Sequence, residues 1–270
     1  CSRMLLTSEN YYSQEANREY LSVSQYKDFM GTYGKPGCEE YALAKLNGTW
    51  VENMEDSDAL MVGSYVDAHF EGTLDVFKAQ HPCMFKKDGT LMAKYLRANE
   101  MIQRCERDEL FSQFMSGQKQ VIMTADFFGA KWKIKIDSYH PDKCIVDLKT
   151  CQSVSKVFYH PDTGHLNFLD EWGYYIQGAV YQKVVEINTG KKLPFFIAAV
   201  SKEKEPEIQL IAVEQSKLDE ALVNVERNTP KIVALKAGRY TPMRCEQCDY
   251  CKHTRVLKSP IWSSALIGEV

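Results

Sequence analysis

The sequence predicts an α/β protein with a mixed central sheet flanked by helices, a helical N-terminal part and a cysteine-bearing C-terminal segment. Three observations predict this class. Apolar residues recur at helical spacing before residue 116, and a strand-like alternation follows from Gln120 to Thr150. Three cysteines then fall within seven residues near the C-terminus. We expect an arm over 1–20 and a single domain over 21–270.

Composition excludes several classes of protein. The 270 residues carry a net charge of −3, with 44% hydrophobic and 26% charged residues, so the chain is neither disordered nor a protein that coats nucleic acid through overall charge. No apolar run reaches the roughly 18 residues of a membrane span, and the first residues have no stretch long enough for a signal peptide. Nine cysteines, an odd number, argue against a disulfide framework and favour a cytoplasmic protein.

The helical part is predicted over about 21–115, after a polar, tyrosine-bearing arm that we expect to be loosely held. Ser22 or Ser24 is placed to cap a helix that runs to Met30, and the glycine-rich stretch that follows ends it. Three further helices are predicted over 38–46, 57–79 and 91–115.

The α/β core is predicted over about 116–215. Strands are expected at 120–127, 130–138, 143–149, 194–201 and 208–213, and a helix at 166–187. An amphipathic helix over 215–236, ended by Gly238, opens the last part of the chain, which carries the cysteines.

Two of these strands carry the strongest chemical signal. Asp147 and Lys149 share one face of an otherwise apolar strand, and a short turn lets Asp137 of the preceding strand approach them. Two carboxylates beside an ammonium form a site for a hard divalent cation such as Mg²⁺ or Mn²⁺, and the lysine is placed to stabilise charge on a phosphate. The alternative is a solvated strand face with an ordinary ion pair.

The arrangement Asp137 … Asp147-Leu-Lys149 resembles the PD-(D/E)xK nuclease core. On the following helix, Gln177 and Tyr181 are similar to the Gln-x-x-x-Tyr motif of the RecB-like branch. Within this branch, the chain most resembles RecE-like phage and prophage exonucleases. The resemblance implies a restriction-endonuclease-like sheet and runs from about Ser22 to Arg255. A helix that merely packs on the sheet would also explain Gln177 and Tyr181.

The chain departs from that family on an earlier helix. The family usually has Gly-x-x-x-His there, whereas Gly63 is followed four residues later by Asp67, and His69 comes two residues after that. Residues two apart on a helix point about 200° apart, so only one of these two side chains faces the site. The family position implies that Asp67 joins Asp137 and Asp147 as a metal ligand.

The cysteines Cys245, Cys248 and Cys251 have metal-ligand spacing. Thiolates suit zinc or an iron–sulfur cluster, and the fourth ligand is either the distant Cys38 or His253. Some RecB-like nucleases resemble this pattern, with one cysteine before the core and three after it holding a 4Fe–4S cluster, although their last gap is usually longer. A 4Fe–4S cluster, Zn²⁺ and ordinary reduced cysteines are the three interpretations.

The resemblance implies a Mg²⁺- or Mn²⁺-dependent deoxyribonuclease that degrades linear duplex DNA from its ends in phage-type recombination or repair. Asp137 and Asp147 would hold the metal, Lys149 would act on the attacking water, and Gln177 and Tyr181 would support the substrate or the lysine. A single-strand annealing protein is an implied partner, and a homo-oligomer is possible. The alternatives are a catalytically idle DNA-binding or scaffold module and a restriction-type endonuclease. Lysines beside Asp137, namely Lys131, Lys133 and Lys135, are candidates to line a groove for the phosphate backbone.

Overall fold

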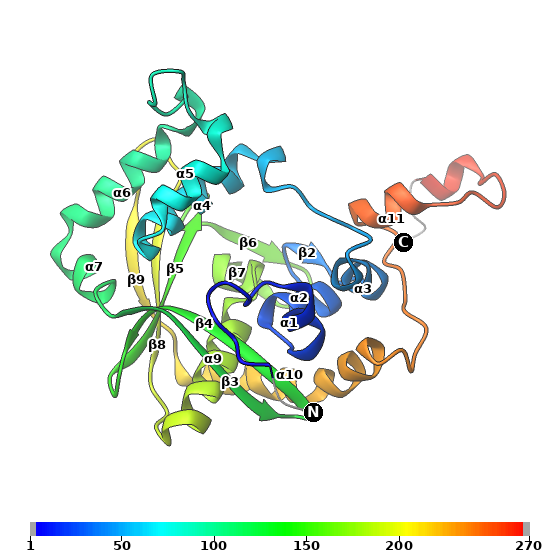
Figure 1. The fold of residues 1–270 in the computed structure, drawn as a ribbon. Helices are drawn as coiled ribbons and strands as arrows, with labels where there is room; N and C mark the ends of the chain where they lie inside the picture. Colours follow the sequence, from blue (N-terminus) through cyan, green and yellow to red (C-terminus); the bar gives the residue numbers. More distant parts are fainter. Residues whose placement is uncertain (1–3, 267–270) are drawn as a thin grey trace.

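The structure is a computed structural model that describes residues 4–266. Its centre is a five-stranded sheet in the order β3-β4-β5-β8-β9 (Figure 1). The strands are β3 (Gln118–Phe127), β4 (Ala130–His140), β5 (Cys144–Cys151), β8 (Phe195–Ser201) and β9 (Ile208–Ala212). Only β5 and β8 pair in parallel and the other neighbours are antiparallel, so the expected mixed central sheet is confirmed.

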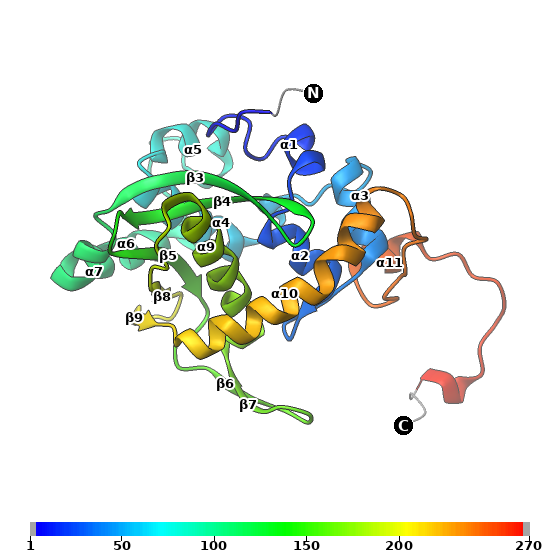
Figure 2. The ribbon, with the colours of Figure 1, turned by 90° about the horizontal axis from the view of Figure 1, so that it is seen from below.

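Two groups of helices cover the two faces of this sheet (Figures 1 and 2). One face is packed by α2 (Val23–Met30), α9 (Tyr174–Thr189) and α10 (Gln215–Lys236). The other is packed by α4 (Asp58–Glu71), α5 (Leu74–Gln80), α6 (Arg97–Arg107) and α7 (Glu109–Phe114). Strand alternation explains the two cores, because Trp132, Ile134 and Ile136 face the first group while Val146 and Leu148 face the second.

Three predicted helices are shorter than expected, each for a local reason. The helix predicted over 57–79 breaks at Gly72, whose backbone is left-handed and caps α4. The one over 91–115 divides at Asp108, whose side chain caps the start of α7. The one over 166–187 divides at Gly173, which separates α8 (Phe168–Glu171) from α9.

Two small hairpins were not predicted. The first consists of β1 (Gly31–Thr32) and β2 (Lys35–Pro36), and it precedes α3 (Glu39–Asn47). The second consists of β6 (Val157–His160) and β7 (Gly164–Asn167), which lies where a helix was expected to begin. Both are short and largely unburied, so neither leaves the alternating apolar pattern from which strands are recognised.

The expectation of a loose N-terminal arm is wrong for its described residues. A short helix, α1 (Gln14–Glu19), forms within it, and Tyr11, Ala16 and Tyr20 are buried. The ammonium of Lys133 donates to the carbonyl of Tyr11 and to the side chain of Asn17. The arm is therefore fastened to β4 by a lysine from the sheet itself. Residues 1–3 of the expected arm and 267–270 of the expected domain lie outside the described residues.

The C-terminal part runs from α10 to α11 (Asp249–Thr254), which contains Cys251. An extended stretch then leads to a short 3-10 helix over Ser263–Leu266 (Figure 2). Within residues 4–266, no helix combines the length and the apolar composition that crossing a membrane requires.

Candidate functional site

A break in the sheet creates the centre of the candidate site. Strands β4 and β5 pair only from Ser138 opposite Val146 to His140 opposite Cys144, and beyond this point they separate. The backbone N–H of Leu148 therefore has no β4 carbonyl opposite it and donates instead to Oδ2 of Asp137, at 2.8 Å. Because a buried N–H must find an acceptor, the separation of the strands fixes the carboxylate beside β5.

The predicted site residues from four different elements, α4, β4, β5 and α9, converge on one cavity of about 370 Å³. Its lining includes the acidic residues, the lysine and both residues of the predicted helix motif, namely Asp67, Asp137, Asp147, Lys149, Gln177 and Tyr181. Glu71, one helical turn after Asp67, also lines it. Residues more than 100 positions apart in the sequence thus meet at a single place.

Asp147 is held on both of its carboxylate oxygens. The side-chain amide of Gln177 donates to Oδ1 at 2.8 Å, and the ammonium of Lys149 lies 2.6 Å from Oδ2. That ammonium also lies 4.7 Å from the ring centre of Tyr174, over its face. Asp147 is buried, so these contacts supply the stabilisation that water would otherwise give its charge.

Helix α9 reaches the site because it packs closely on the sheet. A Cβ at Gly178 would lie 2.6 Å from the ring of Phe195 and 2.7 Å from Leu218, so only glycine permits this distance. One residue earlier, Gln177 points to Asp147, and one turn later the hydroxyl of Tyr181 donates to the backbone carbonyl of Lys135 at 3.1 Å. Tyr181 therefore ties α9 to β4 at the edge of the cavity.

Helix α4 brings the carboxylate of Asp67 to the cavity, and it too packs closely through a glycine. A Cβ at Gly63 would lie 2.7 Å from the hydroxyl oxygen of Thr150 on β5, so the glycine allows the helix to approach the strand. Asp67 follows one turn later and lines the cavity. His69 points elsewhere and pairs with Glu106 of α6. The structure thus places Asp67 and not His69 beside the other two carboxylates.

The electrostatics of the cavity favour a bound cation. Burial raises the pKa of Asp67 to about 7; Lys149 opposes this shift, and Glu71 adds to it. Burial and then the charge of Asp147 raise the pKa of Asp137 well above its usual value. Burial alone would lower the pKa of Lys149, but Asp147, Tyr174 and Asp137 together raise it above its usual value, so the ammonium stays charged. Carboxylates that repel one another when ionised are relieved by a metal ion.

The donor set fits a hard divalent cation. Three carboxylates from α4, β4 and β5 offer oxygen ligands, as Mg²⁺ and Mn²⁺ prefer. Oδ2 of Asp147 is buried and forms an ion pair with the Lys149 ammonium, but within residues 4–266 it accepts no hydrogen bond. This leaves a lone pair of Oδ2 for a further ligand.

Three residues of the site were missed by sequence reasoning. Lys27 of α2 lines the cavity, and burial together with Lys149 lowers its pKa to about 8. Tyr174 covers Lys149, and Gln120 of β3 donates to Oδ1 of Asp137 at 3.2 Å. Tyr174 lies one helical turn before Gln177, and this spacing is a signal by which it could have been found. Nothing in the sequence singles out Lys27 or Gln120.

The proposed basic groove beside Asp137 needs one correction. Lys133 lines the cavity but is only 2% exposed, and its ammonium is bound to the N-terminal arm, so it is not free to contact a phosphate backbone. Lys135 lines the cavity and its ammonium lies 4.4 Å from the ring centre of Tyr12, while Lys131 pairs with Glu19 at 3.5 Å. The sequence correctly predicted that Lys133 and Lys135 lie on the same face of β4 as Asp137. The expectation of a free Lys133 was wrong because the N-terminal arm, which was expected to be loose, covers it.

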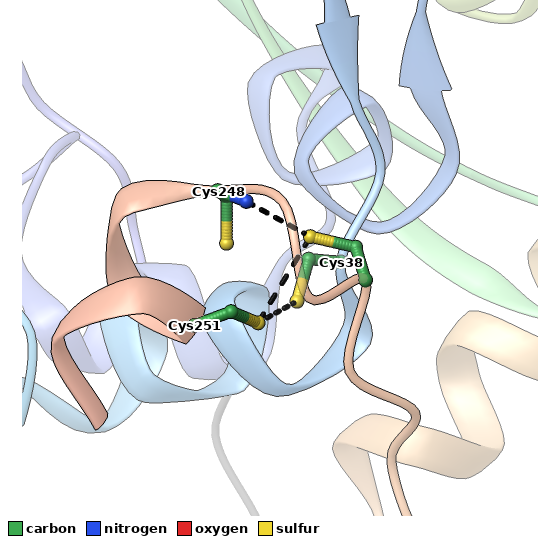
Figure 3. Close-up of side chains that lie close together, drawn as sticks. Cys38, Cys248 and Cys251 are labelled. Carbon is green, nitrogen blue, oxygen red and sulfur yellow. Dashed lines mark hydrogen bonds between the residues drawn. The ribbon is translucent and has the colours of Figure 1, made fainter. Parts of the chain in front are cut away.

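The four cysteines form a second centre (Figure 3). The sulfurs of Cys38, Cys245, Cys248 and Cys251 all lie within 4.8 Å of one another. The sulfur of Cys251 is 3.6 Å from that of Cys38 and 3.9 Å from that of Cys245. His253 is not part of this group and instead lies 5.5 Å, between ring centres, from Trp50. The cluster joins the start of α3 to α11 across more than 200 residues of sequence.

The surroundings of Cys245 favour a thiolate. The backbone N–H groups of Gln247 and Cys248 point at its sulfur, at 3.4 and 3.2 Å. Burial opposes ionisation, but these N–H groups and the neighbouring thiols lower the pKa of Cys245 to about 7. Burial raises the pKa of Cys38, and burial also raises the pKa of Cys248, to about 12. A metal ion would allow several thiolates to form together.

Comparison with known proteins decides the family. The model of a PDDEXK-like domain of unknown function (DUF3799) matches residues 22–254. The chain belongs to this PDDEXK-like family. It is therefore a member of the PD-(D/E)xK superfamily, as the sequence motifs predicted.

One solved structure is very similar to this PDDEXK-like chain. It is a crystal structure described as "Putative exonuclease" from Eubacterium rectale, 56% identical in sequence, with a TM-score of 0.95. The match covers 99% of this chain and all of that one. Among curated proteins, nothing matches the chain.

Proposed function

We propose that the protein is a metal-dependent exonuclease that hydrolyses phosphodiester bonds at the ends of linear duplex DNA. The observation that carries the proposal is the convergence of Asp67, Asp137, Asp147 and Lys149 on one cavity. Membership of the PDDEXK-like family and the description of the Eubacterium rectale relative support it.

The side chains of the cavity have distinct roles in this proposal. Asp67, Asp137 and Asp147 would hold Mg²⁺ or Mn²⁺, which when bound supplies a Lewis acid and favours ionisation of water. The ammonium of Lys149, fixed between Asp147 and Tyr174, places a positive charge where the phosphate develops negative charge. Gln177 would hold the carboxylate of Asp147 in position, and Tyr181 would hold β4.

The shape of the cavity favours a strand end over an intact duplex. The N-terminal arm forms one wall through Tyr11 and Tyr12, and α2 forms another through Lys27. A cavity of about 370 Å³ with these walls suits a nucleotide of a single strand, which favours an unpaired strand end as substrate. The exposed ring of Tyr12 and the ammonium of Lys135 beside it suit a base and a phosphate.

The direct test is cleavage of linear and closed circular duplex DNA, each with Mn²⁺ or with EDTA. We expect cleavage of the linear form only, lost in EDTA. Asp147→Ala should lower the rate by more than about 100-fold, and Lys149→Ala should lower turnover while metal binding persists. Asp142→Ala, on an exposed turn, is the matched control. Cutting of circular DNA would indicate an endonuclease, and no cutting at all would favour an idle DNA-binding module.

We propose in addition that the four cysteines bind a metal that clamps the two ends of the chain. A single zinc ion with bonds of about 2.3 Å holds four thiolates about 3.8 Å apart, close to the 3.6 and 3.9 Å measured here. A 4Fe–4S cluster, which the Cys-x2-Cys-x2-Cys spacing suits, binds each thiolate to a different iron and needs wider separations. Metal analysis of anaerobically purified protein distinguishes about four irons from one zinc per chain.

The family resemblance supports three wider proposals. They are a role in phage-type recombination or repair, a single-strand annealing protein as partner, and assembly of several copies. The nine cysteines, an odd number, support a further proposal, that the protein is cytoplasmic.

A further inference from the structure

Gln120 has a backbone conformation that its position does not explain. It is the third residue of β3 and lies inside the ladder, yet its φ is +53°, in the left-handed region that residues other than glycine rarely adopt. The ladder between β3 and β4 is regular on both sides, from Lys119 opposite Ser138 to Val121 opposite Ile136, and is interrupted only at Gln120. Strained residues of this kind persist where the surrounding structure holds them, often at functional sites.

The residue that faces this irregularity across the ladder is Asp137. The distorted backbone sends the side chain of Gln120 toward the cavity, where Nε2 donates to Oδ1 of Asp137 at 3.2 Å. The other oxygen, Oδ2, accepts from the N–H of Leu148 at 2.8 Å. Both oxygens of Asp137 are thus held, one from each neighbouring strand.

The remaining amide atom of Gln120 points to a ligand. Its Oε1 is buried and has no hydrogen-bond partner within residues 4–266. Rotating the amide by 180° would not give Oε1 a donor, because Oε1 would then face the carboxylate of Asp137 in place of Nε2. Leaving a buried acceptor unsatisfied is costly, so a molecule bound in the cavity is expected to supply its partner. Gln120 also lines a smaller hollow beside the main cavity, together with Asp67, Glu71 and Asp137.

We infer that Gln120 is a positioning residue of the metal site, which fixes the carboxylate of Asp137 in the direction that binds the cation. It does for Asp137 what Gln177 does for Asp147, where an amide also donates to one carboxylate oxygen. Residues that orient metal ligands typically change metal affinity or activity by about 10- to 100-fold when they are removed. The inference rests on the proposed function, because it needs the carboxylates to bind a metal.

Gln120→Gly separates this role from a role in folding. Glycine adopts the left-handed conformation without strain, so the variant should fold with a melting temperature at or near that of the wild type. Gln120→Asn also tolerates the conformation but is one methylene too short to reach Asp137. The matched control is Gln118→Ala, which removes an exposed glutamine side chain from the same strand.

Three properties are measured for each variant. They are the Kd for Mn²⁺ by calorimetry, the affinity for DNA with Ca²⁺ in place of Mn²⁺, and the kcat and KM of DNA cleavage. We expect both Gln120 variants to bind Mn²⁺ about 10- to 100-fold more weakly and to lose kcat, with DNA affinity and KM unchanged. Variants that bind Mn²⁺ as tightly as the control, or that both fail to fold, would overturn the inference. If instead the wild type binds no Mn²⁺ or Asp147→Ala still cleaves DNA, the proposed function itself fails.

Discussion

The carboxylates of the cavity are costly to ionise without a metal, and Asp67 shows this most clearly. Its pKa is raised to about 7 by burial, with the negative charge of Glu71 adding to the shift against the opposing charge of Lys149. The folded protein therefore binds a proton at Asp67 over a pH range in which the unfolded chain has already released it. A structural cost of this kind is expected where a cation is to be bound.

This shift predicts how the stability of the metal-free protein depends on pH. Between about pH 4 and 7 the folded state binds more protons than the unfolded state, so stability falls as the pH rises through this range. Asp67→Asn removes part of the fall. At pH 8 the variant should have a higher free energy of unfolding than the wild type, measured by urea unfolding. The gain should be less than about 4 kcal/mol, because the cavity is open to water.

The control for this prediction is His69→Ala, two residues away on the same helix but outside the cavity. It should leave the Mn²⁺ affinity as it is, whereas Asp67→Asn should weaken Mn²⁺ binding. The opposite pattern, with His69 mattering and Asp67 not, would show that the wrong face of α4 was assigned to the site.

At the scale of elements, two glycines set the distances on which the site depends. Gly63 lets α4 approach β5, and Gly178 lets α9 approach β8 and α10, so Asp67 and Gln177 reach the same cavity from opposite faces of the sheet. The separation of β4 from β5 then opens the sheet between them. The site is thus a consequence of close packing on either side of one irregular pair of strands.

Gly63→Ala tests this role of packing. The added methyl would lie 2.7 Å from the hydroxyl oxygen of Thr150, so α4 must shift outward and carry Asp67 with it. We expect a destabilisation of about 1–3 kcal/mol and Mn²⁺ binding at least about 10-fold weaker, measured by urea unfolding and calorimetry. Leu60→Ala, an exposed residue of the same helix, should change neither. Unchanged Mn²⁺ binding in Gly63→Ala would mean that the approach of α4 does not position Asp67.

The sequence predicts those parts of the site that follow from regular repeats. The period of two in β4 and β5 puts Asp147 beside Lys149, and the helical period relates Gln177 to Tyr181. Gln120 was not predictable, because its contact depends on a left-handed backbone inside a strand. Lys27 comes from α2, and only tertiary packing brings it to the cavity. The hairpin of β6 and β7 was missed because its residues are mostly unburied.

At the scale of the whole molecule, the cysteine cluster joins the N-terminal helix α3 to the C-terminal helix α11. Around it, the ring of Trp50 lies 5.5 Å, between centres, from that of Tyr250, and Arg244 pairs with Glu40 at 3.3 Å. Tyr250 also donates to Glu40 at 3.3 Å. The cluster lies among these contacts, so the attachment of α11 to α3 should depend in part on the bound metal.

Cys38→Ser should therefore reduce bound metal and lower the melting temperature of the protein purified without oxygen. Nuclease activity measured well below that temperature should persist, because the cluster is separate from the carboxylate cavity. The control is Cys83→Ser, an exposed cysteine outside the cluster. The clamp is ruled out if the purified protein carries neither iron nor zinc and its four cluster thiols react freely with a thiol reagent in the folded state.

The central claim is that three carboxylates from α4, β4 and β5 hold a divalent cation, and anomalous diffraction from crystals soaked in Mn²⁺ tests it most directly. The account predicts a manganese peak in the cavity, within about 2.5 Å of carboxylate oxygens of Asp67, Asp137 and Asp147. Diffraction from such crystals with no peak at these carboxylates, at a Mn²⁺ concentration that supports cleavage in solution, would contradict it.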